Sequence, residues 1–202
     1  EGASVGLAAR TRAELEAVRN EIAAAGGAAA CFPADMAVER EVVALVGDVV
    51  AWAGRLDIAV NNAAAGLFGP LEDTDTADWD RVMAVNARGP FVLCREALPH
   101  LRAAGGGHIV NIASVVGIKG YADQSAYTAS KHALMGMSKS LAREVRDDGI
   151  FVHAICPGGV NTGLIRAARP DLDPAELIDP ADVAGAVVFM VTREGNCVVD
   201  QL

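Results

Sequence analysis

The chain of 202 residues is short of positive charge, and this shortage excludes two classes of partner. Seventeen Lys and Arg residues stand against 26 Asp and Glu residues, so the formal net charge is −9. An acidic surface repels nucleic-acid phosphates and anionic lipids, so we expect neither nucleic-acid binding nor membrane attachment. No apolar run reaches the ~18 residues that a membrane-spanning helix needs, and Asp48 interrupts the nearest candidate, residues 42–54.

Metal-binding and secretory signals are lacking as well. No C-x-x-C pair occurs and the four histidines have no metal-ligand spacing, so we expect no metal site. The first residues show no basic region followed by an apolar core, which is the pattern of a signal peptide. We therefore expect a cytoplasmic protein whose cysteines are reduced and mostly buried; they are Cys31, Cys94, Cys156 and Cys197.

Hydrophobic residues are plentiful, and their arrangement indicates the fold. They make up 52% of the chain, enough for one domain over 1–202 with a sizeable core. Short apolar runs alternate with helical patterns. The runs predict strands at 4–9, 28–35, 56–64, 108–114 and 150–158, and 197–202 is a candidate for a last strand. Helices are predicted after a Thr11/Glu14 capping box and at 39–54, 78–104, 124–147 and 180–191.

Such alternation predicts an α/β protein with a doubly wound, Rossmann-like parallel sheet. The run at 56–64 is almost continuously apolar, so we expect both faces of that strand to be covered. Ligands of these folds bind beyond the carboxyl ends of the strands. The positions to consider are therefore Arg10, Asp35, Asn61, Asn62, Ser114, Pro157 and Gly158.

One of the two tyrosines, Tyr127, stands four residues before Lys131, on one face of the predicted helix 124–147. A nearby ammonium lowers the pKa of a phenol, so the pair is a candidate for acid–base catalysis. An ordinary helix surface is the alternative. Ser114 ends a predicted strand thirteen residues earlier, and Asn86 lies a further 28 residues back.

These residues lie in motifs that resemble those of the short-chain dehydrogenases/reductases. The matching pieces are "DIAVNNAA" (57–64), "VNARGPF" (85–91), "HIVNIAS" (108–114), "YTASK" (127–131) and "CPGGVNT" (156–162). The resemblance covers essentially the whole chain. It implies an oxidoreductase that transfers a hydride between a nicotinamide cofactor and a small-molecule carbonyl or alcohol.

The resemblance also implies roles for four residues. Tyr127 would exchange a proton with the substrate oxygen, and Lys131 would lower the tyrosine pKa and bind the nicotinamide ribose. Ser114 would hold the substrate oxygen, and Asn86 would hold a water that links Lys131 to solvent. The alternatives are a strand-end hydroxyl for Ser114 and a capping or buried structural amide for Asn86.

The family's glycine-rich turn after the first strand is not found in this sequence. We expect that a strand with its glycine-rich loop and helix is absent, so the domain is N-terminally incomplete. Ala9, followed by Arg10, stands where an NAD-binding acid would stand, which favours NADP(H) over NAD(H), with Arg10 and Thr11 as ligands; two solvated arginines are the alternative for Arg10 and Arg12. By resemblance, further cofactor ligands are Asp35, Met36, Asn62, Ala63, Pro157, Gly158, Val160 and Thr162. A helix cap is the alternative for Asp35, and a simple turn for the Pro-Gly pair.

Other functions are weighed against this one. A hydrolase elbow at Gly2–Gly6 would precede its strand instead of following it. A sugar-nucleotide epimerase would need a larger substrate segment than the roughly 20 residues after Thr162, which we expect to form a lid. A non-catalytic NADP(H)-binding or regulatory protein on the same scaffold is the main alternative. The family habit of pairing long helices suggests a homodimer or homotetramer.

Overall fold

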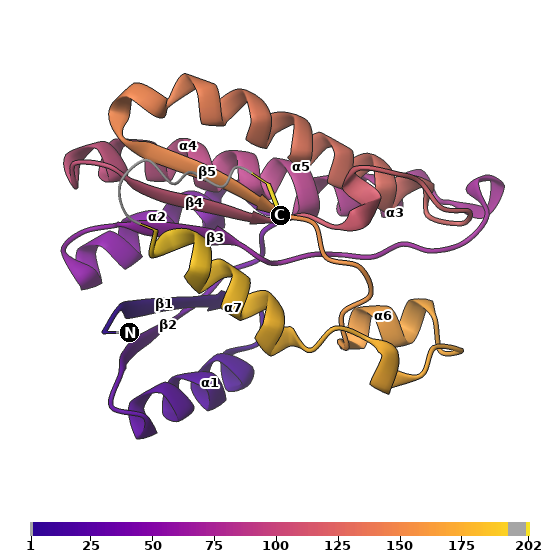
Figure 1. The fold of residues 1–202 in the computed structure, drawn as a ribbon, viewed down its shortest axis with the longest axis horizontal. Helices are drawn as coiled ribbons and strands as arrows, with labels where there is room; N and C mark the ends of the chain where they lie inside the picture. The colour runs from indigo at the N-terminus through magenta and orange to yellow at the C-terminus, as the bar shows by residue number, and fades with distance from the viewer. Residues whose placement is uncertain (1, 194–200) are drawn as a thin grey trace.

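The computed structural model describes residues 2–193 and 201–202 (Figure 1). Its strands pair in parallel and alternate with helices along the chain, which confirms the predicted α/β class. The strands are β1 (Ser4–Ala9), β2 (Ala28–Pro33), β3 (Ile58–Asn61), β4 (Gly107–Ile112) and β5 (Ile150–Ile155). Most of the candidate strand 197–202 lies outside the described residues, but Gln201 forms a parallel bridge with Ala154.

Most helices begin and end close to the predicted positions, but the predicted helix over 78–104 is divided and the helix over 163–168 was not predicted. They are α1 (Arg12–Ala24), α2 (Glu39–Ala53), α3 (Thr76–Met83), α4 (Gly89–Ala103), α5 (Ser125–Glu144), α6 (Gly163–Ala168) and α7 (Pro180–Val191). Asp75 and Asp179 cap α3 and α7 through their carboxylates. The capping box predicted at Thr11 is wrong, because the Thr11 side chain makes no capping hydrogen bond. None of the helices within the described ranges is long and apolar enough to span a bilayer.

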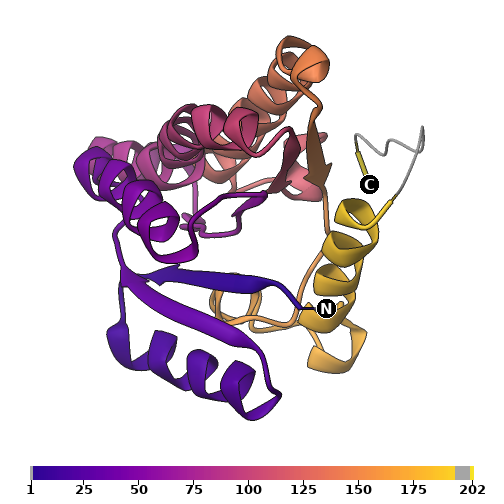
Figure 2. The same ribbon diagram turned by 90° about the vertical axis from the view of Figure 1, so that its left-hand side faces the viewer.

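The strands form two sheets rather than one. β1 pairs with β2, and the second sheet has the order β3-β4-β5. Figure 2 shows the two-stranded sheet lying on α1 and apart from the larger sheet. Helices α4 and α5 cover one face of the larger sheet, and α7 packs on β5 from the other (Figure 1). The facing edges of β1 and β3 are unpaired within the described part of the chain.

The main core lies between the larger sheet and helices α4 and α5. Leu101, Ile109 and Val145 there are fully buried. By contrast, Ile58 and Val60 on β3 are 38% and 42% exposed, so the prediction that both faces of this strand are covered is wrong. These two side chains share a sheet face with His108 and Val110. The apolar side chains of α7 pack on that face against Val110 and Ile155, but not against β3.

Candidate active site

Helix α5 places Tyr127 and Lys131 one turn apart on its buried face. Tyr127 is 8% exposed and Lys131 only 2%, so neither belongs to the exposed helix surface that was the alternative interpretation. The helix packs against β5 and against the short turn Val115–Gly117 that follows β4. The strand ends therefore meet the first two turns of α5, where these two side chains lie.

Lys131 is held by the backbone of the neighbouring strand. Its Nζ donates a hydrogen bond of 2.8 Å to the carbonyl oxygen of Ile112, the last residue of β4. The same Nζ lies 5.8 Å from the centroid of the Tyr127 ring. Burial lowers the pKa of Lys131 to about 8, because the ammonium has lost most of its contact with water. An ammonium can donate three hydrogen bonds, so Lys131 has donors left for another ligand.

Ser114 joins the pair from the end of β4. Its hydroxyl accepts a hydrogen bond of 3.3 Å from the Val116 amide. Burial raises the pKa of Tyr127, and the nearby Ser114 hydroxyl lowers it by less. Desolvation dominates this shift, and the lowering of the tyrosine pKa by Lys131 stays a prediction. A phenol of this kind is protonated at neutral pH and ready to act as an acid.

Asn86 lies in a π-helical turn, Ala84–Arg88, between α3 and α4. The predicted continuous helix over 78–104 is interrupted there, and such turns are frequent at functional sites. The side chain is 1% exposed and fully engaged. Its amide nitrogen donates to the Ala65 carbonyl (2.8 Å) and to the Ser130 hydroxyl (3.0 Å), and its oxygen accepts from the Ala65 amide (2.8 Å). Asn86 thus fastens the loop after β3 to α5, and its link to Lys131 through a water stays a prediction.

The residues expected to hold the adenosine lie at the ends of β1 and β2. Arg10 is exposed and lies close enough to Asp35 to lower its pKa, although a hydrogen bond from the Ala37 amide contributes more. The same carboxylate forms an ion pair of 3.2 Å with Arg81, so Asp35 also stabilises its own loop. Thr11 is exposed, and its hydroxyl caps no helix. Met36 beside Asp35 is half-buried, and its carbonyl lies so near Gly89 that a side chain at 89 would not fit.

The remaining expected cofactor ligands follow β3 and β5. Asn62 and Ala63 are exposed just after β3. Pro157 is joined to the serine side of the site, because its carbonyl accepts a hydrogen bond of 2.8 Å from the Val115 amide. Gly158 is exposed, whereas Val160 and Thr162 are half-buried. Between those two residues, the shielded Oδ1 of Asn161 has no hydrogen-bond partner in the described part of the chain.

These observations test whether a dinucleotide fits. A shielded amide oxygen without a partner, a buried ammonium with spare donors and an exposed arginine at a strand end all suit hydroxyl and phosphate groups. The residues present therefore fit a phosphorylated dinucleotide. Among the described residues, no cluster of three His, Cys, Asp or Glu side chains is placed to hold a metal ion.

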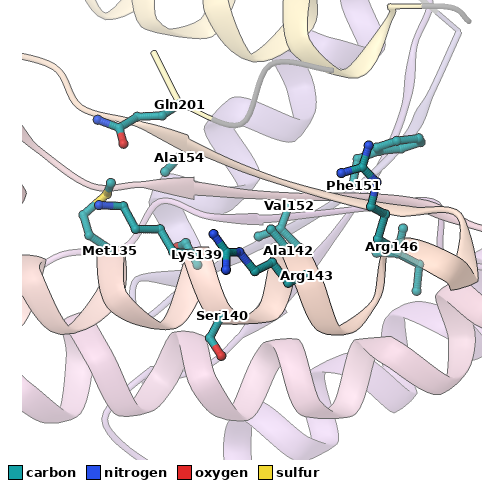
Figure 3. A pocket seen from close by; sticks show the side chains of 12 residues that line it. Met135, Lys139, Ser140, Ala142, Arg143, Arg146, Phe151, Val152, Ala154 and Gln201 are labelled. Carbon is teal, nitrogen blue, oxygen red and sulfur yellow. The ribbon is translucent and has the colours of Figure 1, made fainter. Parts of the chain in front are cut away.

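One hollow lies away from these groups, along the second half of α5 and beside β5. Its volume is about 650 Å³, and its lining includes Lys139, Arg143 and Arg146 (Figure 3). The figure shows the side chains of Lys139 and Arg143 between α5 and β5. Neither Tyr127 nor Ser114 lines it, so this hollow is not the catalytic site.

Three contributors to the site were not predicted from the sequence. Ser130 receives the Asn86 amide, Arg81 pairs with Asp35, and the ring of Phe68 packs on Tyr127 with 5.6 Å between centroids. Each partnership joins residues at least 44 positions apart along the chain. Local spacing gives no signal for such pairs, although one aromatic residue in a loop full of Ala and Gly was a hint for Phe68.

Comparison with known proteins identifies the family of this chain. The family model for short chain dehydrogenases matches residues 1–173. An uncharacterized oxidoreductase of Thermotoga maritima is 41% identical, over 76% of this chain and 61% of that protein. A D-beta-hydroxybutyrate dehydrogenase of Rhizobium meliloti is 38% identical, over 78% of this chain and 62% of that protein.

A solved structure gives the same result in three dimensions. A metagenomic short-chain oxidoreductase in complex with NADP superposes with a TM-score of 0.87 at 36% identity, over 100% of this chain and 84% of that one. The present chain spans only 61% and 62% of the two relatives above. The match over most of the sequence nevertheless settles the classification: the chain belongs to the short-chain dehydrogenase family.

Proposed function

We propose that the complete protein transfers a hydride between NADP(H) and a carbonyl or alcohol carbon, with Tyr127 as the general acid and base. The single observation that supports this most is the convergence of a hydroxyl and an ammonium on one buried phenol. The Ser114 hydroxyl lies near enough to the phenol of Tyr127 to lower its pKa, and the Lys131 ammonium lies 5.8 Å from its ring. This is the machinery needed where a carbonyl oxygen gains negative charge and then a proton.

The protein side chains have distinct tasks in the reduction. The nicotinamide, when bound, supplies the hydride. The Ser114 hydroxyl holds the carbonyl oxygen next to the phenol. Tyr127, which burial keeps protonated, gives its proton to that oxygen as charge develops there. Lys131 uses its spare donors to hold ribose hydroxyls, while its bond to the Ile112 carbonyl keeps the amine in position.

The other end of the cofactor is assigned to the ends of β1 and β2. Arg10 and Thr11 would receive the 2′-phosphate of NADP(H), and Asp35 would accept a hydrogen bond from the adenine amino group. A further strand with a glycine-rich loop and helix would hold the pyrophosphate, as the sequence suggested. The unpaired facing edges of β1 and β3 support that expectation. A cytoplasmic homodimer or homotetramer remains our expectation for the assembly.

The test is a reductase screen with the complete gene product. Diverse ketones and aldehydes are offered with NADPH and with NADH, and cofactor oxidation is followed by absorbance. We expect turnover with NADPH to exceed turnover with NADH. A thermal-shift titration with NADPH accompanies the screen. A clear shift without turnover of any carbonyl compound would favour the non-catalytic binding protein and contradict the enzyme proposal.

A further inference from the structure

The loop that follows β3 is fastened at both ends to the catalytic helix and its surroundings. At one end, Ala65 exchanges two hydrogen bonds of 2.8 Å with the Asn86 side chain. At the other, the Gly69 amide donates a hydrogen bond of 2.8 Å to the carbonyl of Asp123, in the segment just before α5. Asp123 has a φ of 60°, an unusual conformation for a residue other than glycine. Residues 65–69 are thus held firmly against the site.

Phe68 is the residue that this loop presents to the phenol. The two ring centroids are 5.6 Å apart and the rings are tilted by 53°, a favourable aromatic pairing. Because the two rings pack against each other, a substrate oxygen that reaches the Tyr127 hydroxyl brings its substituents close to the Phe68 ring. Phe68 is half-buried, which leaves part of its ring free for a further contact.

The lid segment reaches the same loop through Gly66. A Cβ atom at position 66 would overlap the Phe68 ring and would come within 2.8 Å of Leu164 Cδ1. Glycine at this position therefore allows the first turn of α6 to approach Phe68. Figure 1 shows α6 and the loop after β3 at the same side of the molecule. Phe68, whose ring packs on Tyr127, and Leu164 thus both border Gly66, and we call these two side chains the apolar wall.

Charged groups of the lid are engaged elsewhere. The Arg166 guanidinium donates to the Thr162 carbonyl (3.3 Å), and Arg169 forms a two-bond pair with Asp171. The ammonium near the phenol, Lys131, is bound to the Ile112 carbonyl, and its remaining donors are assigned to the ribose. A substrate carboxylate beside the Phe68 ring would meet hydrocarbon, and its desolvation would be unfavourable.

We propose that Phe68, backed by Leu164, determines substrate specificity by selecting carbonyl compounds whose larger substituent is a flat apolar ring over those whose substituent is charged. This inference rests on the proposed function, since it concerns the substrate of the same site. An aryl ring would pack on the exposed part of Phe68 in an offset or tilted arrangement. Its other face would contact the leucine of the lid.

The test compares acetophenone, an aryl ketone, with acetoacetate, a ketone that carries a carboxylate. The complete gene product is assayed with NADPH, and we expect kcat/KM for acetophenone to be higher by about tenfold or more. Phe68→Ala should lower kcat/KM for acetophenone, mainly through KM, by a factor about 10- to 100-fold larger than the factor for acetoacetate. Phe68→Tyr retains the ring and should restore most of the preference. Phe91→Ala, at an exposed phenylalanine on α4, is the matched control and should change neither value.

Two results would overturn the specificity proposal while leaving the reductase assignment intact. One is a wild-type protein that reduces acetoacetate as well as it reduces acetophenone. The other is an equal loss of kcat for both ketones in Phe68→Ala, which would make Phe68 only a support for Tyr127. Failure of the wild type to reduce any carbonyl compound would refute the proposed function instead. If Phe68→Ala does not fold, Phe68→Leu and Gly66→Ala disturb the same wall and should show the same selective loss.

Discussion

The half of the molecule built on β3, β4 and β5 differs sharply from the half built on β1 and β2. In the first, Lys131 and Asn86 are nearly inaccessible, and backbone or side-chain partners hold each of them. In the second, Arg10, Thr11 and most of α1 are exposed, and Leu15 is the sole buried residue of that helix. The catalytic groups are therefore fixed before any ligand binds, whereas the groups assigned to the adenosine end lie on an open surface.

The difference indicates which contacts hold the side chains of each half in place. Fully buried polar side chains persist only when they are hydrogen-bonded, so the catalytic half specifies its geometry through its own core. The half built on β1 and β2 shows spare capacity instead, in the solvated guanidinium of Arg10. Substitutions in the two halves should accordingly act on different quantities, namely stability and turnover in the first and cofactor selection in the second.

The largest effect is expected from Lys131→Met in the catalytic half. Turnover should fall by roughly a hundredfold or more, since the ammonium is lost from the proton-transfer group. Stability should change in the opposite direction at neutral pH. The folded-state pKa of about 8 lies below the ordinary value of 10.5, so burying the charge destabilises the wild type below pH 8, and this penalty fades as the pH rises from 8 to 10.5.

Urea unfolding at pH 7 and at pH 10 measures this effect. The variant should be more stable than the wild type at pH 7, by an amount on the order of 1–3 kcal/mol, and the margin should shrink at pH 10. Lys139→Met, at an exposed lysine of the same helix, should leave the pH dependence unchanged. A margin independent of pH would contradict the buried-ammonium account.

Asn86→Ala should have the next largest effect, on stability. It removes the partners of both the amide and the carbonyl of Ala65 and one partner of Ser130. Leaving buried polar groups unpaired costs about 1–3 kcal/mol in the free energy of unfolding. Urea melts of this variant and of Asn20→Ala, at an exposed asparagine on α1, provide the comparison. Equal stability of the two variants would show that the loop after β3 is not held as described.

The smallest effect is expected in the open half, from Arg10→Ala. The dissociation constant for NADPH should rise about tenfold, as expected for loss of one charge-assisted hydrogen bond, while that for NADH changes little. Arg12→Ala is the matched control, because Arg12 is already paired with Glu16 at 3.8 Å. Titration calorimetry on the complete gene product measures both constants. Equal weakening of the two cofactors would remove the basis for NADP(H) preference.

Much of the fold was predictable because it is encoded locally. The apolar runs of β1 and β4 and the helical patterns of α2 and α7 were placed within a residue or two. Tyr127, Lys131 and Ser114 were also predicted, since their spacing and order in the chain carry the family signal. The division of the strands into two sheets and the exposure of Ile58 and Val60 were not predicted. Which elements cover a strand depends on residues that are distant in the sequence.

The electrostatics of the site escaped prediction for the same reason. The sequence places an ammonium near a phenol, but the degree of burial decides which way the phenol pKa moves. The π-helical turn at Asn86 is also invisible locally, because its amide is paired with Ala65 and Ser130 across the loop and helix. Pattern and spacing thus indicated the candidate reacting groups, whereas their environment required three dimensions.

The most direct test of the account is the turnover of Tyr127→Phe with NADPH and a carbonyl compound that the wild type reduces. The account predicts that the rate falls by about 10²- to 10⁴-fold while the dissociation constant for NADPH stays within about a factor of three. Tyr121→Phe, at the exposed second tyrosine, should behave like the wild type. A Tyr127→Phe protein that reduces the same compound at the wild-type rate would contradict the central claim that this phenol supplies the proton.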